Sequence, residues 1–440
     1  MIILRTVKNI SSLNIAASVL LFLAAILAAV VANSSLSPVY QDFLLQELHL
    51  RIGNFNLFSH GGHPLKMIEF INDCLMTVFF LAVGLEIKRE LLVGELSSVR
   101  KAALPFIAAC GGMVVPVVIY ALSVASGTPE TRGMAIPMAT DIAFSLGVLS
   151  LLGKRVPLSL KIFLTAFAVV DDIGGILVIA LFYSADVAYG YLIAAAVLYV
   201  FLYYMGKFGV TQKIFFLFFG VIIWYLFLQS GIHSTISGVI LAFVIPARPR
   251  LDAGKYIERI RDIIGEFPVS KSDNIVLTNA QIATLKQVER ASDYVISPLQ
   301  SLEDNLHGAV SFVILPLFAF ANAGVVFSGS GSIVGDVSIA VAAGLLLGKF
   351  LGIYLFTWLA VKSGVALMPA GMNWKNIAGV SLLGGIGFTV SLFIANLSFA
   401  GEYPELLNQA KFGVLVGTVL AGVLGYAVLN TVLPKTTKTK

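Results

Sequence analysis

Four ionisable residues lie in the middle of long apolar segments: Asp141, the tandem pair Asp171 and Asp172, and Lys349. An ionisable group at the centre of a bilayer is costly unless it is paired or hydrated, so each of the four is a candidate functional residue. Adjacent residues of a helix point about 100° apart, so Asp171 and Asp172 cannot both face one partner. One of them can pair with Lys349, while the other faces water and holds a proton or a hard cation.

Cation/proton exchange is the chemistry that these residues favour. A proton and Na⁺ would compete for the same carboxylate oxygens, so binding of one ion releases the other. The sequence therefore predicts that Asp171 and Asp172 bind Na⁺ and protons, with Thr140 and Asp141 as further candidate ligands. Charges that only hold helices together are the alternative. That alternative is disfavoured because three aspartates and a lysine exceed what packing requires.

The elements that must position these residues are apolar helices. The chain has 440 residues, of which 58% are hydrophobic and only 12% are charged. That is about half the charged fraction of an ordinary soluble domain. A spanning helix needs about 20 mostly apolar residues. The sequence predicts an all-α polytopic membrane protein with twelve such segments, near 13–32, 67–86, 102–124, 134–152, 158–183, 187–205, 213–229, 232–246, 305–326, 337–361, 376–399 and 408–432.

Lysine and arginine residues alternate between the connections of these segments. Most of them lie in every second connection, such as the one that follows 67–86 and the one that follows 134–152. Positive residues stay on the cytoplasmic side, so both termini are predicted to be cytoplasmic. This alternation needs the segment 13–32 to remain, which disfavours a cleaved signal peptide. The net charge of +5 is spread over these loops and does not favour a nucleic-acid partner.

Two of the predicted segments carry marks of interruption. Pro137 removes a backbone hydrogen bond from 134–152, and Gly384, Gly385 and Gly387 weaken the middle of 376–399. Each is the central helix of a triplet, helices 3–5 and helices 10–12, and the two triplets enter the membrane from opposite sides. Interrupted helices at corresponding positions of inverted repeats indicate a transporter binding site.

Two connections are longer than a turn. The external stretch 34–65 alternates around Gly53 and predicts a β-hairpin. We expect a homodimer through this hairpin, because its exposed edge can pair with that of a second copy. The cytoplasmic stretch 247–300 has isoleucines at helical spacing between basic residues, which predicts a partly helical loop on the membrane lipid. Residues 1–440 are otherwise treated as a single transmembrane domain.

Five strings of the sequence resemble the NhaA family of bacterial sodium/proton antiporters. They are FFLAVGLEIKRE (79–90), ATDIAF (139–144), VDDIG (170–174), LPLFAFANAG (315–324) and GIGFT (385–389), in family order across nearly the whole chain. The resemblance implies an NhaA-type antiporter fold of twelve helices, in which helices 4 and 11 are broken and cross at mid-membrane. Inverted repeats are a property of this family, so the triplet pattern is not independent of the resemblance.

The resemblance also implies roles for the buried charges. Asp172 would be the main cation ligand, Asp171 would pair with Lys349, and Thr140 would complete the cation shell. Asp141 and Lys349 would lie near the helix breaks, where half-helix ends carry partial charges of about ±0.5. For Asp141, balancing the helix ends and transporting ions directly remain equally open.

A pH-sensing cluster at the inner funnel is a further implication of the resemblance. Its members are Glu86, Arg89, Glu90, Glu303 and His307. The alternative is a solvated helix end, which is favoured for Lys88. The chain departs from the family pattern at Gln300 and Asp304, which leaves its activating pH open. His233 also matches the family but is interpreted as a structural residue more than as a sensor.

The predicted function is exchange of cytoplasmic Na⁺, and by resemblance Li⁺, for external H⁺ in a bacterial inner membrane. By resemblance the exchange is electrogenic with about two protons per cation, regulated by pH, and serves pH homeostasis and salt tolerance. No cofactor is expected, and the protein is not expected to be an enzyme. A sodium-coupled solute symporter is the alternative, although few polar side chains remain to bind an organic solute. An intramembrane aspartyl protease is disfavoured because Lys349 would neutralise its pair of carboxylates.

Overall fold

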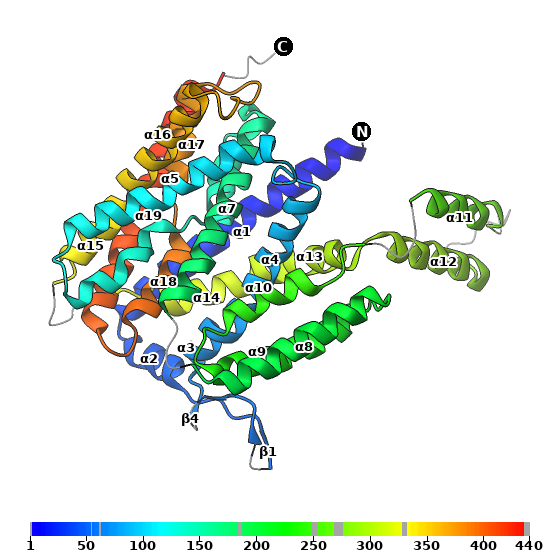
Figure 1. Cartoon of the computed structure of the whole chain (residues 1–440), viewed down its shortest axis with the longest axis horizontal. Coiled ribbons are helices and arrows are strands. Elements are labelled where there is room, and N and C mark those ends of the chain that lie inside the picture. Colours follow the sequence, from blue (N-terminus) through cyan, green and yellow to red (C-terminus); the bar gives the residue numbers. More distant parts are fainter. Residues whose placement is uncertain are drawn as a thin grey trace.

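Long apolar helices form a bundle in the computed structural model, which describes residues 2–53, 55–60, 63–183, 187–248, 253–267, 276–327 and 332–434 (Figure 1). Within these ranges, nine helical segments are long and apolar enough to cross a membrane. Two further pairs of helices pass the same test together and are bent by 45° and 44° at short breaks. The protein is therefore a multi-pass membrane protein.

The helices that could span a membrane singly are of two kinds, continuous α-helices and helices with a π-helical segment inside them. The continuous helices are α1 (Ile2–Ala32), α5 (Val99–Ser123), α7 (Leu158–Phe182), α8 (Tyr189–Lys207), α9 (Lys213–Ser230) and α19 (Pro404–Val432). The composite helices are α3 (Met67–Phe70) with η1 (Ile71–Leu75) and α4 (Met76–Leu92), α13 (Pro298–Ala309) with η4 (Val310–Ile314) and α14 (Leu315–Asn322), and α15 (Asp336–Ala343) with η5 (Gly344–Gly348) and α16 (Lys349–Lys362). π-Helical turns are rare in proteins, and those that occur are often found at functional sites.

The bent pairs lie in the two segments in which the sequence predicts a break. They are η2 (Pro129–Met138) with α6 (Ile142–Leu151), and α17 (Trp374–Leu383) with α18 (Phe388–Phe399). In the segment predicted at 232–246, the structure has the short apolar helix α10 (Thr235–Val244) of ten residues. A helix of that length is about 15 Å long, half the thickness of the hydrocarbon layer. The number of twelve spans therefore stays a prediction.

α7 carries the tandem aspartates through the most buried part of the bundle. Every residue from 166 to 172 is buried. Its apolar residues lie all around the helix, which is typical of a helix buried in protein or in a membrane. Its neighbours include α5, which packs closely on α16: a Cβ added to Gly352 would lie only 2.1 Å from the carbonyl oxygen of Gly111. Small residues permit such close packing of membrane helices.

The two ends of the bundle differ. The start of α1 and the end of α19 lie at one end, here called the terminus side (Figure 1). α2 (Ser37–Leu45) and four short strands lie at the opposite end, here called the strand side. β1 (Arg51–Ile52) pairs antiparallel with β2 (Phe55–Asn56), and β3 (Ser59–His60) pairs with β4 (His63–Pro64). Asn54, within the predicted hairpin, lies outside the described residues.

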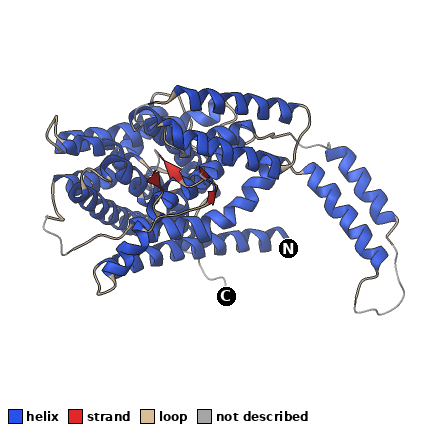
Figure 2. Cartoon of the chain, turned by 90° about the horizontal axis from the view of Figure 1, so that it is seen from below, coloured by secondary structure: helices blue, strands red, loops and turns tan. Residues whose placement is uncertain are grey.

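Two helices stand away from the bundle. α11 (Ala253–Gly265) and α12 (Asn279–Val295) pack on each other and project to one side (Figures 1 and 2). They fall within the predicted cytoplasmic loop 247–300, of which residues 249–252 and 268–275 lie outside the described part. The remaining short element is the 3-10 turn η3 (Gly153–Arg155), which follows α6.

Candidate functional site

The two bent helix pairs meet at their breaks. In the first break, the N–H of Asp141 donates to the carbonyl oxygen of Ile386 at 2.6 Å. The hydroxyl of Thr140 donates to the carbonyl oxygen of Gly384, 244 residues further along the chain, at 2.7 Å. Backbone groups that a helix break leaves without partners are expensive in lipid unless other groups bind them. Each break thus supplies hydrogen-bond partners to backbone groups of the other break.

A matching pair of serines joins the two bent pairs. Ser145 of α6 donates to the carbonyl oxygen of Leu383, at the end of α17 (3.0 Å). Ser391 of α18 donates to the carbonyl oxygen of Ile136, near the end of η2 (2.8 Å). Carbonyls at a helix end lack intrahelical donors. Each bent pair therefore supplies a donor to the interrupted end of the other, which keeps the crossing in one geometry.

The residues that the sequence marks as helix breakers lie at this crossing. Pro137 lies in η2, just before the first break, and Gly384, Gly385 and Gly387 lie in the second break. A Cβ added to Gly385 would come within 2.4 Å of the carbonyl oxygen of Leu345. The glycines are therefore needed for the close approach of the chains as well as for the break itself.

Asp141 caps two half-helices. Its Oδ1 accepts from the N–H of Phe144 at the start of α6 (3.0 Å). Its Oδ2 accepts from the hydroxyl (2.6 Å) and the N–H (3.2 Å) of Thr389 at the start of α18. A carboxylate is favourable at a helix N-terminus, where the helix dipole is positive. This geometry matches the balancing role that the sequence left open for Asp141, since both oxygens are already bound by protein donors.

Asp171 and Lys349 form a fully buried ion pair. The Lys349 Nζ lies 2.5 Å from Asp171 Oδ2, and neither side chain is exposed. The Lys349 ammonium also lies 5.8 Å from the centre of the Phe167 ring. The second oxygen, Asp171 Oδ1, is buried and accepts no hydrogen bond of ordinary geometry from the described residues, although Thr140 lies close to the carboxylate. A buried acceptor without a donor is rare in proteins and indicates an available binding position.

Asp172 has the opposite surroundings to Asp141. Its residue is 7% exposed, and within the described part of the chain no side chain or backbone group donates to its carboxylate. The charged groups that act on it electrostatically are Asp171, Glu86, Asp141 and Lys349. The carboxylate of Asp172 thus has no donor among the described residues, and the Asp171 carboxylate lies within electrostatic reach of it.

A second charged cluster lies at the terminus-side end of α4. Arg89 binds Glu303 of α13 at 2.6 Å and Glu90 at 3.1 Å, and lies 3.9 Å from Glu86. Their side chains are between 14% and 35% exposed, so water reaches this cluster. His307 lies exposed in the last turn of α13. Across the described residues, no hydrogen bond or ion pair joins His307 to the other members.

Lys88 has a structural position. Its ammonium donates to the carbonyl oxygens of Phe243 (2.7 Å), Ala242 (3.3 Å) and Ile245, at the end of α10. A lysine at a helix C-terminus binds the last carbonyls and favours the negative end of the helix dipole. Lys88 therefore binds carbonyl oxygens that the end of α10 leaves without intrahelical donors.

His233 lies buried in the connection between α9 and α10. Its Nδ1 lies 2.9 Å from the hydroxyl oxygen of Thr235, and its Nε2 lies 3.5 Å from Asp73. In the portion of the chain that the structure describes, no cluster of three or more His, Cys, Asp or Glu residues is placed to hold a metal ion.

Sequence reasoning missed Ser145, Thr389 and Ser391 as residues of the crossing. Small hydroxyl residues are common in apolar helices, so none of them stands out by type. A positional signal exists nevertheless, because Ser145 comes four residues after Asp141 and Ser391 four residues after Gly387. A hydroxyl one turn into the second half of each interrupted helix is a pattern that matched repeats would share.

Comparison with known proteins gives a consistent result. Residues 8–429 match the family described as Na+/H+ antiporter 1. The Na(+)/H(+) antiporter NhaA of Bacteroides thetaiotaomicron is 75% identical over 434 residues, which cover 99% of each chain. The protein of the same name from Bacteroides fragilis is also 75% identical, over 435 residues. That of Phocaeicola vulgatus is 62% identical over 93% of this chain and 92% of the relative.

Proposed function

Because the chain belongs to the NhaA family of Na⁺/H⁺ antiporters, we propose that it exchanges Na⁺ for H⁺ through Asp171 and Asp172. The observation that carries this proposal is the contrast on α7. Asp172 is buried without a donor, and beside it Asp171 has one oxygen bound to Lys349 and one oxygen unbound. Carboxylate oxygens are the ligands that hard cations prefer, and they are also the atoms that protons bind.

The exchange follows from competition at this pair. Without Na⁺, a proton occupies the Asp172 carboxylate and a second proton is held by the Asp171–Lys349 pair. Na⁺ binds when Asp172 and the free oxygen of Asp171 offer it negative oxygens, which requires both protons to leave. The second proton comes either from Asp171 or from a Lys349 that separates from its partner.

The stoichiometry of about two protons per cation makes the exchange electrogenic. One net charge then crosses the membrane in each cycle, and a membrane potential does about 2.3 kcal/mol of work per 100 mV on that charge. A potential that is negative inside would drive protons in and Na⁺ out. We propose that Li⁺ uses the same oxygens.

Reconstituted vesicles test this function directly. A K⁺ gradient with valinomycin sets the potential, and a trapped dye reports internal pH after Na⁺ is added with no organic solute present. We expect Na⁺-driven proton flux that increases with the potential. Flux that ignores the potential would indicate one-for-one exchange, and flux only with an organic solute would favour the alternative, a sodium-coupled symporter.

The terminus-side cluster is proposed to regulate exchange by pH. Glu86 belongs to this cluster through Arg89, and it also lies within electrostatic reach of Asp172. A change in the charge of the cluster would therefore alter how strongly Asp172 attracts a cation. We include Glu90, Glu303 and the exposed His307 in this regulatory role.

Thr140 is proposed as a further ligand of the cation at the crossing. Its hydroxyl would turn from the carbonyl oxygen of Gly384 to the ion.

The membrane arrangement is proposed from charge and topology together. The terminus side, with Arg89 and Lys154, would face the cytoplasm of a bacterium, and the strand side would face outward across the inner membrane. Counting α10 and each bent pair as one span gives the twelve spans of this arrangement. Export of Na⁺ in this direction would support salt tolerance and pH homeostasis.

A homodimer through the strands is the last element of the proposal. The pairs β1–β2 and β3–β4 are short and lie at the edge of the strand side. Such edges can pair with those of a two-fold related copy. Deleting residues 47–58 should give monomers that still exchange ions, measured by light scattering in detergent and by vesicle flux. Dimers of unchanged stability would assign the strands another role.

A further inference from the structure

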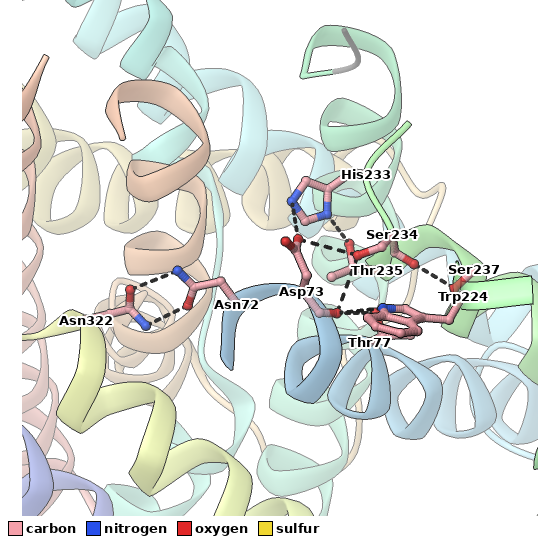
Figure 3. Close-up of polar contacts among 9 residues, drawn as sticks. All are labelled: Asn72, Asp73, Thr77, Trp224, His233, Ser234, Thr235, Ser237 and Asn322. Carbon is pink, nitrogen blue, oxygen red and sulfur yellow. Dashed lines mark hydrogen bonds and ion pairs between the residues drawn. The ribbon is translucent and has the colours of Figure 1, made fainter. Parts of the chain in front are cut away.

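Three side-chain amides form a chain of hydrogen bonds near the strand side of the bundle. They are Asn72 in η1, Asn322 at the end of α14 and Asn396 in α18. Figure 3 shows the first two facing each other. Asn322 and Asn396 are buried, and Asn72 is partly buried. The carbonyl oxygen of Phe320, close to Asn322, accepts from Tyr40 of the strand-side helix α2, which places the chain on that side.

Asn322 uses its full hydrogen-bonding capacity. Its Oδ1 accepts from the amide of Asn396 at 2.8 Å and from that of Asn72 at 3.3 Å. Its Nδ2 donates to Asn72 Oδ1 at 2.8 Å and to the carbonyl oxygen of Phe318 at 2.9 Å. A primary amide has two donors and two acceptor positions, so nothing at Asn322 is left unmade. Separating the partners in an apolar surrounding would be costly, whereas water could replace them.

The chain connects directly to the helix crossing. Asn396 lies seven residues after Thr389, which is two turns of α18 and nearly the same face of the helix. Thr389 binds Asp141 at the crossing. α18 is therefore held at its first turn by the break of the other bent pair, and two turns later by an amide of α14. A movement of α18 away from α14 must break the bond between Asn396 and Asn322.

Aromatic rings close the space between these two attachments. The ring of Phe393 in α18 lies 5.6 Å from that of Phe80 and 5.2 Å from that of His233. It also lies 6.4 Å from the ring of Phe318 in α14. Phe80, Phe318 and Phe393 are all buried. The strand side of the crossing is thus closed by a layer of rings, and the amide chain lies beyond it.

The far end of the amide chain is anchored in the neighbouring helices. Asn72 is followed in η1 by Asp73, whose carboxylate faces His233 and Ser234 (Figure 3). The carbonyl oxygen of Asp73 accepts from Thr77 at 2.5 Å and from the Trp224 ring N–H at 3.4 Å. Adjacent residues of η1 therefore face opposite neighbours. Asn72 faces α14, and Asp73 fixes the turn to α9 and α10.

We propose that Asn72, Asn322 and Asn396 form a latch that holds the strand side of the ion site closed and that opens when the site is exposed to that side. The inference rests on the proposed exchange, because exchange requires Asp171 and Asp172 to face the two sides in turn. α18 lies between the site and the strand side, and the latch is its polar attachment to α14. In the open state, water that enters the gap would bind the separated amides.

Transport measured separately from each side tests the latch. Asn396→Leu keeps the volume of the side chain and removes its amide. The matched control is Ser398→Ala in the same helix, which loses bonds to Tyr183 and to Ile394 but none to α14. In right-side-out and inside-out vesicles, the half-saturating Na⁺ concentration is measured on each face.

The expected result is a lower half-saturating Na⁺ concentration on the strand side without a fall on the terminus side. Loss of one net hydrogen bond increases the population open to the strand side by about five-fold. The half-saturating Na⁺ concentration on the strand side should fall by up to that factor, while that on the terminus side stays equal or rises. Ser398→Ala should leave both values unchanged. Asn322→Leu also removes both bonds to Asn72. The bond between α18 and α14 is already lost in Asn396→Leu, so adding Asn322→Leu should shift the values little further.

Other outcomes overturn the latch. Asn396 would have a purely structural role if the half-saturating Na⁺ concentration rose equally on both faces. The same conclusion would follow from a lower maximal rate with both half-saturating concentrations unchanged. If Asn396→Leu does not fold, Asn396→Ser removes the reach to Asn322 with a smaller change and carries the same expectation. A wild-type protein without exchange would contradict the proposed function itself, which separates that failure from failure of the latch.

Discussion

Asp141 and Asp172 are both buried carboxylates, 3% and 7% exposed, yet they differ in every contact. Asp141 accepts from two backbone N–H groups and a hydroxyl, which belong to the starts of two half-helices. Asp172 accepts from none of the described residues. Burial alone therefore does not distinguish the carboxylate that caps two half-helices from the one that we propose to bind an ion. The number of donors around it does.

Asp171 is intermediate between these two cases. One of its oxygens is bound by Lys349, and the other is bound by none of the described residues. The three carboxylates thus form a series from fully bound to unbound. If the series is correct, substitutions along it should move their main effect from transport to stability.

The largest effect is expected at the unbound end. Asp172→Asn keeps the volume of the side chain but cannot exchange a proton or present a negative oxygen. Na⁺-driven proton flux should fall by at least about 100-fold, because the variant loses the negative charge that binds both Na⁺ and the proton. The melting temperature should change little. Asp42→Asn, at an exposed position of α2, is the control and should transport normally. Retained flux in Asp172→Asn would end the assignment.

Lys349→Met should reduce both transport and folding stability. Removing one member of a buried ion pair leaves a buried charge without a partner, which costs about 3–5 kcal/mol of folding stability. Thermal unfolding in detergent measures this loss. The double variant Asp171→Asn/Lys349→Met should recover most of it, because no charge is then left alone. Lys362→Met, at the exposed end of the same helix, is the control. An equally unstable double variant would show that the ion pair is not the cause.

Asp141→Asn should mainly reduce stability. Asparagine retains one acceptor oxygen, but it loses the second acceptor and the charge that favours two helix starts, a loss of about 1–3 kcal/mol. Flux measured at a temperature where the variant is folded should exceed that of Asp172→Asn by a wide margin. Flux as low as in Asp172→Asn would place Asp141 among the transporting groups instead.

The smallest effects are expected at the two serines of the crossing. Ser391→Ala and Ser145→Ala each remove a side-chain donor from one carbonyl at a break, and each should cost about 1 kcal/mol. Because the two serines hold corresponding positions, their costs in thermal unfolding should be nearly equal. Ser363→Ala, which loses only a local bond to Ala360 at the end of α16, is the control. A large difference between the two serines would show that the halves of the crossing are not equivalent.

The sequence predicts the positions of the buried charges and of the helix breaks better than the contacts that hold the helix crossing together. Depth in a helix can be counted along the chain, so the sequence alone predicts that the aspartates of α7 and the lysine of α16 lie at a similar depth. Pro137 and the glycines of the second break act through their own backbone, so they mark the breaks directly. The predicted family is confirmed by the comparisons.

The contacts that hold the crossing together could not be predicted in the same way. The donor of Leu383 is Ser145, and the partner of Thr389 is Asp141, in both cases more than 200 residues away in the chain. Such contacts depend on how distant helices pack, which residue type and spacing do not determine. The 3-10 form of η2 and the shortness of α10 were missed for the same reason. His307 shows the converse, since its helix is as expected but none of the described residues of the cluster forms a hydrogen bond or ion pair with its side chain.

Proton release on Na⁺ binding tests the central claim most directly. Purified protein in weakly buffered detergent solution is mixed with NaCl, and a pH dye counts the protons that are released for each Na⁺ bound. Competition for the same oxygens predicts release of about two protons per Na⁺ and weaker Na⁺ binding as the pH falls. Asp172→Asn should bind no Na⁺ and release no protons. Na⁺ binding without proton release, or with an affinity that does not depend on pH, would contradict the account.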